Sequence, residues 1–363
     1  MSVNQQPIDR RKFVATIAAG AAATLSAPAI VTASKTDSAI VLGNGNHRYE
    51  PIHDWPQLPS QYTWQTTHDV AIDRDGFVYV IHEGKPELPD HPAIFVFDSD
   101  GRYVRSFGRE FQGGGHGLEV REEAGEQYLY VCGYQPKVFA KLTLAGEVVW
   151  QGRAPMASHL YADGEDTESL ARNTRVNFMP TNFAFLNDGG FFLADGYGSF
   201  FIHHYDKDAK WLRCFGGPGN VDGKFNTPHG LWIDNRQGRD ASLVVTDRAN
   251  GKLQWFSPEG THQRTLGGFI MPANIDFYGD TMLVPDLAAR VTLLDRDNNV
   301  IVHLGDDADW RAEVMKMEIR KLPGRWPAGK FIHPHDACFD HDGNIFVAEF
   351  VEPGRITKLR RLS

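Results

Sequence analysis

The sequence predicts an all-β fold, a six-bladed β-propeller, because one short strand-rich phrase recurs six times along it. Successive copies begin 48, 66, 47, 45 and 61 residues apart, and periods of about 40 to 50 residues in strand-rich units are typical of propeller blades. Within each copy, short runs of alternating apolar and polar residues end in Asp-Gly, Pro-Glu-Gly or Ala-Gly turns. The copies start at His68, His116, Asn182, His229, Asn274 and His335.

The first copy shows the phrase most completely. Residues 68–76 form its opening strand and turn, the apolar run 77–80 follows, and a third strand is expected at 94–98. The last copy repeats the first half of the phrase over 334–348. The copy that starts at Asn274 is the most degenerate.

The two long spacings place insertions near 153–178 and 305–332, the second with a helical pattern over 309–321. The last copy shows only three clear strands, ending at 355–362. We therefore expect 39–42 to supply a fourth strand to the last blade and to close the ring.

Residues 1–33 predict a twin-arginine signal peptide. The run Asp-Arg-Arg-Lys-Phe-Val at 9–14 precedes an Ala-rich apolar stretch, and Ala-Pro-Ala and Val-Thr-Ala both fit a small-residue cleavage site. An uncleaved anchor helix is the alternative, but the stretch is short and weakly apolar for a membrane span. We expect the propeller to occupy 38–363, with no later membrane span, in a periplasmic or secreted protein that loads any cofactor before export.

Composition narrows the range of partners. The 363 residues carry a formal net charge of -9 without a lysine or arginine block, which argues against nucleic acid. The three cysteines are widely spaced and form no CxxC pair, so no disulfide framework is indicated. We expect a monomer with a small-molecule or peptide substrate in its central channel.

Histidines occupy the innermost position of alternate blades. The first strand of every blade lines the channel of a propeller, and blades two, four and six carry His116, His229 and His335 there. Imidazoles from alternate blades can converge on one axial point, and three protein ligands with an open position are typical of a catalytic zinc site. Water-bonded channel histidines are the alternative.

Three other residues belong to the same prediction. Asp336 follows His335 directly, and its carboxylate is either a hard oxygen ligand or a hydrogen-bonded structural group. Tyr197 and Arg248 end equivalent strands of neighbouring blades. Beside a metal, a tyrosine can act as general base and an arginine can hold a carboxylate or stabilise developing negative charge. Aromatic packing and a structural Asp247–Arg248 contact are the alternatives.

These residues together resemble peptidyl-α-hydroxyglycine α-amidating lyase, a family of six-bladed, NHL-type propellers. The resemblance runs from about residue 70 to the end. It is carried by 195–197 with 223–231, by 247–254, by 334–336 and by 116–118. Residues 195–197 hold the counterpart of the family's tyrosine, and 223–231 hold that of its second zinc histidine. Residues 116–118 and 334–336 hold the counterparts of the first and the last zinc histidine.

The resemblance implies a zinc held by His116, His229 and His335, with Tyr197 as base and Arg248 assisting the substrate. It also implies a structural calcium near the backbone oxygen of Leu118 and the carboxylate of Asp336. The family cleaves a carbinolamide C–N bond to yield a peptide amide and glyoxylate.

Some positions depart from the family pattern. Glu83 stands where the family has a channel arginine, and a carboxylate there should repel an anionic peptide carboxylate. His333 replaces a methionine, and Gly198 replaces a disulfide cysteine. His68 is an additional imidazole in the first blade.

Three functions remain open from the sequence. The leading hypothesis is a metal-dependent lyase or hydrolase of the amidating-lyase type, acting on a carbinolamide-type or related small substrate. The second is a non-enzymatic NHL propeller that binds a peptide, glycan or protein partner. The third is a propeller lactonase with calcium on acid and amide side chains, which the recurring histidines disfavour.

Overall fold

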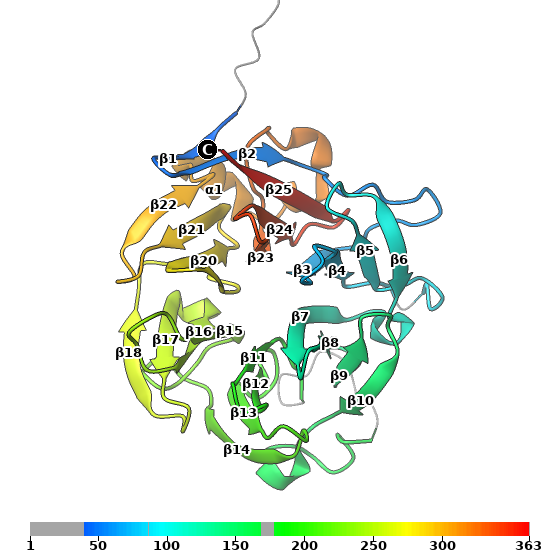
Figure 1. Ribbon diagram of the computed structural model, residues 1–363, viewed down its shortest axis with the longest axis vertical. Helices are drawn as coiled ribbons and strands as arrows, with labels where there is room; N and C mark the ends of the chain where they lie inside the picture. Colours follow the sequence, from blue (N-terminus) through cyan, green and yellow to red (C-terminus); the bar gives the residue numbers. More distant parts are fainter. Residues whose placement is uncertain (1–39, 86, 168–177, 363) are drawn as a thin grey trace, which may run out of the picture. The chain divides into compact units, whose positions relative to one another are not determined.

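The computed structural model describes residues 40–85, 87–167 and 178–362, and these form a six-bladed β-propeller (Figure 1). The sequence prediction of the fold is confirmed. Each blade is an antiparallel sheet, and in blades one to five the strands run in chain order from the channel outward. The predicted signal segment, 1–33, lies outside the described residues.

Blades one to three each contain four strands. Their strands are β3 (Thr67–Ile72), β4 (Val78–His82), β5 (Ile94–Phe97) and β6 (Tyr103–Phe107); β7 (Gly115–Glu123), β8 (Glu126–Gly133), β9 (Val138–Thr143) and β10 (Val148–Gly152); and β11 (Phe183–Phe185), β12 (Phe191–Ala194), β13 (Phe201–Tyr205) and β14 (Trp211–Gly216).

Blades four and five follow the same plan, and blade six adds strands from the start of the described chain. Their strands are β15 (Pro228–Asp234), β16 (Ser242–Asp247), β17 (Lys252–Phe256) and β18 (His262–Leu266); β19 (Asp276–Tyr278), β20 (Thr281–Asp286), β21 (Arg290–Leu294) and β22 (Val300–Leu304); and β23 (Pro334–Phe339), β24 (Ile345–Glu349), β25 (Arg355–Leu362), β2 (His47–Ile52) and β1 (Leu42–Asn44).

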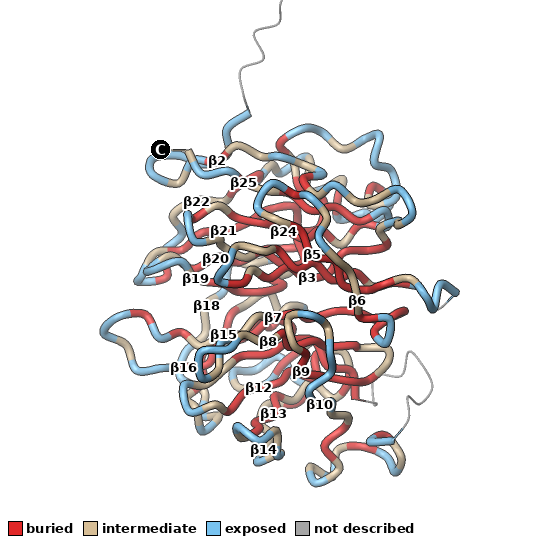
Figure 2. The backbone as a smooth tube through the Cα atoms, turned by 45° about the vertical axis from the view of Figure 1, so that its right-hand side comes forward, coloured by how far each residue is buried: buried red, intermediate tan, exposed pale blue. Residues whose placement is uncertain are grey.

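The hydrophobic core is divided among the interfaces between neighbouring blades. One cluster joins blades one and two through residues such as Tyr79 and Leu129, and equivalent clusters join each later pair. A further cluster packs Phe346 of blade six against Val80 of blade one. Figure 2 shows the buried stretches passing through the middle of the ring and the exposed ones in the peripheral loops. Each blade is therefore held by apolar contacts with both neighbours, as expected of a closed ring.

The strand that closes the ring differs from the prediction. The fourth position of the last blade, expected for 39–42, is taken by β2, which pairs with β25. Leu42 belongs to β1, a fifth strand outside β2. The run at 40–42 is apolar, but Ile40 and Val41 are exposed, whereas Tyr49 in β2 is 2 % exposed and packs in the core between blades five and six. A tight turn after Asn44 folds the apolar run back to the outer edge.

Both predicted insertions carry short helices. The first contains a 3-10 turn, Met156–Ser158, and Tyr161, which packs on the core of blades two and three; 168–177 lie outside the described residues. The second contains α1 (Ala308–Val314) and 3-10 turns at Ile319–Lys321 and Pro323–Arg325, as its pattern indicated.

All three cysteines are free thiols, and two of them are partly exposed. No helix in the described ranges is long and apolar enough to cross a membrane.

Closure of the ring by β2 predicts that Tyr49→Ala destabilises the protein strongly. Removing a fully buried aromatic side chain typically costs about 3–5 kcal/mol, because its burial is lost and a cavity remains. Urea unfolding should show a reduced midpoint. Truncation of Val149, which is exposed in β10, to alanine should leave the unfolding free energy within about 0.5 kcal/mol of wild type and the midpoint nearly unchanged. Equal midpoints for both variants would contradict closure by β2.

Candidate metal centre

Four histidines meet at the channel where the inner strands begin. His68 and His116 lie at the start of β3 and β7, and His229 and His335 lie at the start of β15 and β23. All four are at least 98 % buried. We call His68, His116, His229 and His335 the histidine cluster.

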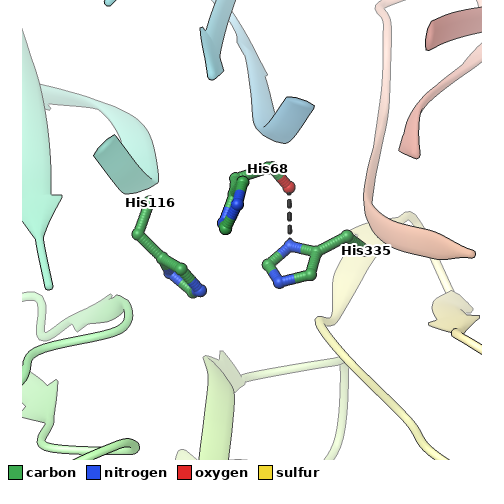
Figure 3. A group of neighbouring side chains, drawn as sticks. All are labelled: His68, His116 and His335. Carbon is green, nitrogen blue, oxygen red and sulfur yellow. Dashed lines mark hydrogen bonds between the residues drawn. The ribbon is translucent and has the colours of Figure 1, made fainter. Parts of the chain in front are cut away.

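The rings of the cluster contact one another. The ring centroids of the predicted trio, His116, His229 and His335, lie 4.6–4.9 Å apart. His68 approaches two of the three, with centroids 4.8 Å from His116 and 4.7 Å from His335. One nitrogen each of His68, His116 and His335 lies within 4.8 Å of the other two (Figure 3).

The predicted trio shares a backbone anchor that His68 lacks. The Nδ1 of each ring donates to a carbonyl oxygen at the inner edge of the next blade: His116 to Thr181 at 2.9 Å, His229 to Ala273 at 2.7 Å, and His335 to His68 at 2.7 Å. A carbonyl only accepts, so the proton of each neutral ring is on Nδ1 and its Nε2 carries a lone pair. This is the outer-shell arrangement found around metal-bound imidazoles.

The Nε2 lone pairs do not pair with one another. The Nε2 atoms of His116 and His229 lie 3.1 Å apart, and neither nitrogen carries a proton that could join them. The Nε2 of His335 is buried without a hydrogen-bond partner among the described residues. Two imidazole nitrogens on one tetrahedral zinc lie about 3.3 Å apart, so a cation of that kind fits between them. The described residues thus suit a transition metal, and the anchors favour His116, His229 and His335 over the alternative trio with His68.

Burial keeps the cluster in the form that binds metals. Desolvation lowers the pKa of His116 to about 3, and the Thr181 carbonyl opposes this only in part. The pKa of His229 and that of His335 also fall well below the usual value, first through burial and then through neighbouring imidazoles and Arg248. Neutral imidazoles are the ligands that divalent metals require.

Tyr197 and Arg248 both lie at the cluster. The Tyr197 hydroxyl is 3.0 Å from the Nε2 of His116 and 2.9 Å from that of His229. Arg248 donates to the same hydroxyl oxygen at 3.1 Å. Burial raises the pKa of Tyr197, and the adjacent guanidinium opposes that rise. The phenol oxygen is therefore set where a proton acceptor beside a bound metal would stand.

Tyr134, at the end of blade two's β8, was not predicted. Its hydroxyl donates to Glu83 at 2.7 Å, and its ring lies 5.6 Å from His116 and 5.4 Å from Tyr197. The equivalence of β8 and β12, which ends before Tyr197, could have indicated its place. Phe350 closes another side, 5.4 Å from His68. Aromatic rings thus pack around the histidine cluster, and the Glu83 carboxylate lies at its edge.

Four buried acids lie on the inner strands, and three of them follow a cluster histidine on the same strand. We call Asp69, Glu119, Asp276 and Asp336 the carboxylate cluster; all are at most 8 % exposed. None of the four pairs with a lysine or arginine of the described ranges. Burial raises the pKa of all of them, and the Asp336 charge adds to the rise for Asp69 and Glu119.

A small cavity adjoins the carboxylate cluster and suits an oxygen-preferring cation. It measures about 100 Å³, and Glu119, Asp276 and Asp336 line it with Asn274. The Oδ1 of Asn274 is buried without a partner, while its Nδ2 donates to Asp336. Leu118, the other predicted calcium residue, is buried in β7, and its backbone contacts the Asp69 carboxylate. Carboxylate, carbonyl and amide oxygens are the ligands calcium prefers.

Comparison with known proteins finds relatives of this chain. No family model matches the chain. It is 29 % identical over 199 residues to peptidyl-alpha-hydroxyglycine alpha-amidating lyase 1 of Drosophila melanogaster, covering 49 % of this chain and 34 % of that protein. A probable lyase of the same name from Caenorhabditis elegans is 27 % identical over 189 residues, covering 50 % of this chain and 49 % of that protein. These curated relatives are amidating lyases.

A longer relative extends the match. Peptidyl-glycine alpha-amidating monooxygenase B of Xenopus laevis is 24 % identical over 286 residues, which is 77 % of this chain and 30 % of that protein. The chain thus spans about a third to a half of the length of the amidating enzymes it matches.

Solved structures share the fold. Virginiamycin B lyase from Staphylococcus aureus aligns with a TM-score of 0.52 and 14 % identity over 86 % of this chain and 100 % of that one. A Bacteroides thetaiotaomicron protein of unknown function aligns with a TM-score of 0.58 and 13 % identity, over 86 % and 76 %.

The carboxylate cluster predicts that Asp276 contributes stability that is lost as pH rises when divalent cations are removed. Burial raises the pKa of Asp276 from about 4 to about 7, so the folded protein holds this proton more tightly than the unfolded chain. This contribution, roughly 1–3 kcal/mol, should be lost between pH 4 and pH 7. The buried histidines with lowered pKa values add an opposite dependence on pH that wild type and an Asp276 variant share. Urea unfolding in EDTA at several pH values measures the slope.

In Asp276→Asn this loss should be absent, so its unfolding free energy should fall less, or rise more, between pH 4 and pH 7 than that of wild type. The exposed Asp54→Asn should keep the wild-type dependence on pH. Absolute stability is not the readout, because Asp276 accepts backbone hydrogen bonds from Phe277 and Phe339 that an amide cannot both replace. Equal slopes in the two variants would contradict a protonated Asp276.

Proposed function

We propose that this chain is a metal-dependent lyase of the amidating type, cleaving the C–N bond of a carbinolamide-type or related small substrate. One observation carries the proposal: three imidazoles with carbonyl-anchored Nδ1 atoms point their lone pairs at one place, and the Tyr197 hydroxyl contacts two of them. The names of the amidating lyases among the chain's relatives support the same chemistry.

His116, His229 and His335 would hold the metal, with zinc as the ion that best suits three neutral imidazoles and an open position. A zinc ion there would act as a Lewis acid that polarises the substrate hydroxyl. Asp336 and the Leu118 carbonyl would hold a structural calcium.

The protein's own groups would move the proton. Tyr197 takes the proton from the substrate hydroxyl, the carbon–oxygen bond becomes a carbonyl, and the carbon–nitrogen bond breaks. The nitrogen then receives a proton to give the amide, so the elimination consumes no water and changes no oxidation state. Arg248 donates to the Tyr197 oxygen at 3.1 Å and stabilises its negative charge. Burial of the site strengthens this interaction.

Glu83 affects which substrate enters. Its side chain is 30 % exposed and lies 3.9 Å from the Nε2 of His68. A carboxylate at this margin disfavours a substrate carboxylate close to it. The proposal therefore extends to small carbinolamides without a carboxylate.

We also propose that the propeller acts after export by the twin-arginine route, as a periplasmic or secreted monomer. The arginine pair and the Ala-rich stretch of the first 33 residues support export. A metal loaded in the cytoplasm is compatible with that route.

Metal content tests the centre directly. Wild-type protein should purify with about one zinc or similar ion per chain at the histidines, and His116→Ala, His229→Ala and His335→Ala should each lose it, because two ligands bind far more weakly than three. Elemental mass spectrometry after gel filtration measures this. His204→Ala removes a buried histidine of β13 outside the cluster and should keep the metal. Metal-free wild-type protein would instead favour a binding propeller.

Activity tests the roles of Tyr197 and Arg248. With N-benzoyl-α-hydroxyglycine, zinc-loaded wild type should release benzamide and glyoxylate. Tyr197→Phe and Arg248→Gln should lower kcat by about 10²-fold or more, because each removes a group that acts in proton transfer. Chromatography of benzamide provides the rate, and both variants should retain zinc.

Tyr205→Phe is the matched control for this test. Tyr205 is also buried, but its hydroxyl has no partner among the described residues, so turnover should match wild type. Full turnover by Tyr197→Phe would remove the tyrosine from the mechanism. Zinc-loaded wild type that cleaves no carbinolamide would overturn the proposed function.

A further inference from the structure

His68 differs from the other members of the histidine cluster in its hydrogen bonding. His116, His229 and His335 each donate from Nδ1 to a backbone carbonyl. Among the described residues, neither ring nitrogen of His68 has a hydrogen-bond partner, although the residue is only 2 % exposed. Leaving a buried polar group unpaired typically costs about 1–3 kcal/mol, so two unpaired nitrogens on one ring require an explanation.

The surroundings of His68 offer few other partners. Phe350 contacts the ring edge-on at 5.4 Å, and Tyr134 stacks against it at 6.2 Å. The carboxylate of Glu83 lies 3.9 Å from Nε2, which is beyond hydrogen-bonding distance. On its remaining sides the ring meets His116 and His335, with nitrogens of the three within 4.8 Å of one another (Figure 3). The polar region nearest to His68 is therefore the one the other imidazoles share.

We propose that His68 is a fourth, exchangeable imidazole ligand of the metal centre, which binds in the resting protein and withdraws when substrate enters. Four imidazoles complete the tetrahedral set that zinc favours, whereas three leave a position open. The absence of a backbone anchor leaves the His68 ring free to turn, in contrast to the three anchored rings. This inference rests on the metal centre of the proposed function but not on the lyase reaction.

Glu83 is placed to receive the displaced ring. Its Oε1 accepts a hydrogen bond from Tyr134 at 2.7 Å, which holds the carboxylate at the margin of the cluster. Its Oε2 faces His68, and a modest rotation of either side chain would bring the two into hydrogen-bonding distance. Withdrawal of His68 therefore exchanges one polar partner for another at one of its ring nitrogens.

Zinc X-ray absorption spectroscopy tests the inference. Wild-type protein should show four imidazole nitrogens on zinc, and His68→Asn should show three with an added oxygen. Asparagine is the residue this chain carries at the same register in blades three and five, so the variant suits the fold. His68→Phe, which keeps the aromatic packing, provides a second variant. His204→Asn removes a buried imidazole with an unpartnered Nδ1 outside the cluster and should keep four.

Exchange is tested in the Tyr197→Phe protein, where slow turnover preserves the complex. Addition of N-benzoyl-α-hydroxyglycine should lower the imidazole count from four to three, and cobalt-substituted protein should show a matching change in its visible bands. Addition of the substrate to His68→Asn should leave the count at three.

The outcomes separate this inference from the proposed function. The same imidazole count in wild type and both His68 variants would overturn the inference. The proposed lyase function would be unaffected by this result, because the benzamide assay tests it separately. A drop from four to three with no turnover of any carbinolamide would support the inference while the proposed function fails. A count that stays at four with substrate would overturn the exchange.

Discussion

The antiparallel pairing of β2 with β25 joins the two ends of the propeller, and the positions of all six inner strands depend on it. Each blade packs on two neighbours, so an unclosed ring would leave the apolar faces of blades one and six without full support. Closure also sets the separation of the inner strands across the channel. The histidine cluster draws its members from four different blades. Its geometry is therefore a property of the closed ring rather than of any local motif.

Hydrogen bonds between blades then orient the side chains. His116, His229 and His335 lie on the inner strands of the even-numbered blades, and each donates to a backbone carbonyl of the blade that follows. These bonds select one tautomer and turn the Nε2 lone pairs toward the channel. The single hydroxyl proton of Tyr197 can bond only one of those of His116 and His229, and that of His335 has no partner among the described residues. Lone pairs facing one another at 3.1 Å repel without a cation between them. The fold thus holds its imidazoles in an arrangement that a metal would relieve.

Neighbouring positions on the inner strands separate two kinds of ligand. On β3 and β23 a histidine precedes an aspartate directly, His68 before Asp69 and His335 before Asp336. Successive side chains of a strand point in different directions, so nitrogen donors gather in one region and carboxylates in another. The nitrogen set suits a transition metal, and the carboxylates suit calcium. One repeated dipeptide therefore supplies two chemically distinct regions of the same channel.

The sequence by itself determined the number of blades, the register of the inner strands and the meeting of three imidazoles from alternate blades, because all of these follow from a repeat visible along the chain. It also located Tyr197 and Arg248, which end equivalent strands. The tertiary structure decided that β2 rather than the apolar run at 40–42 closes the ring, since burial against blade five outweighs local hydrophobicity. It alone distinguished three anchored histidines from the unanchored His68 and joined Tyr134 to Glu83. Such contacts link residues far apart in the chain, and their hydrogen-bond directions exist only once the blades have closed.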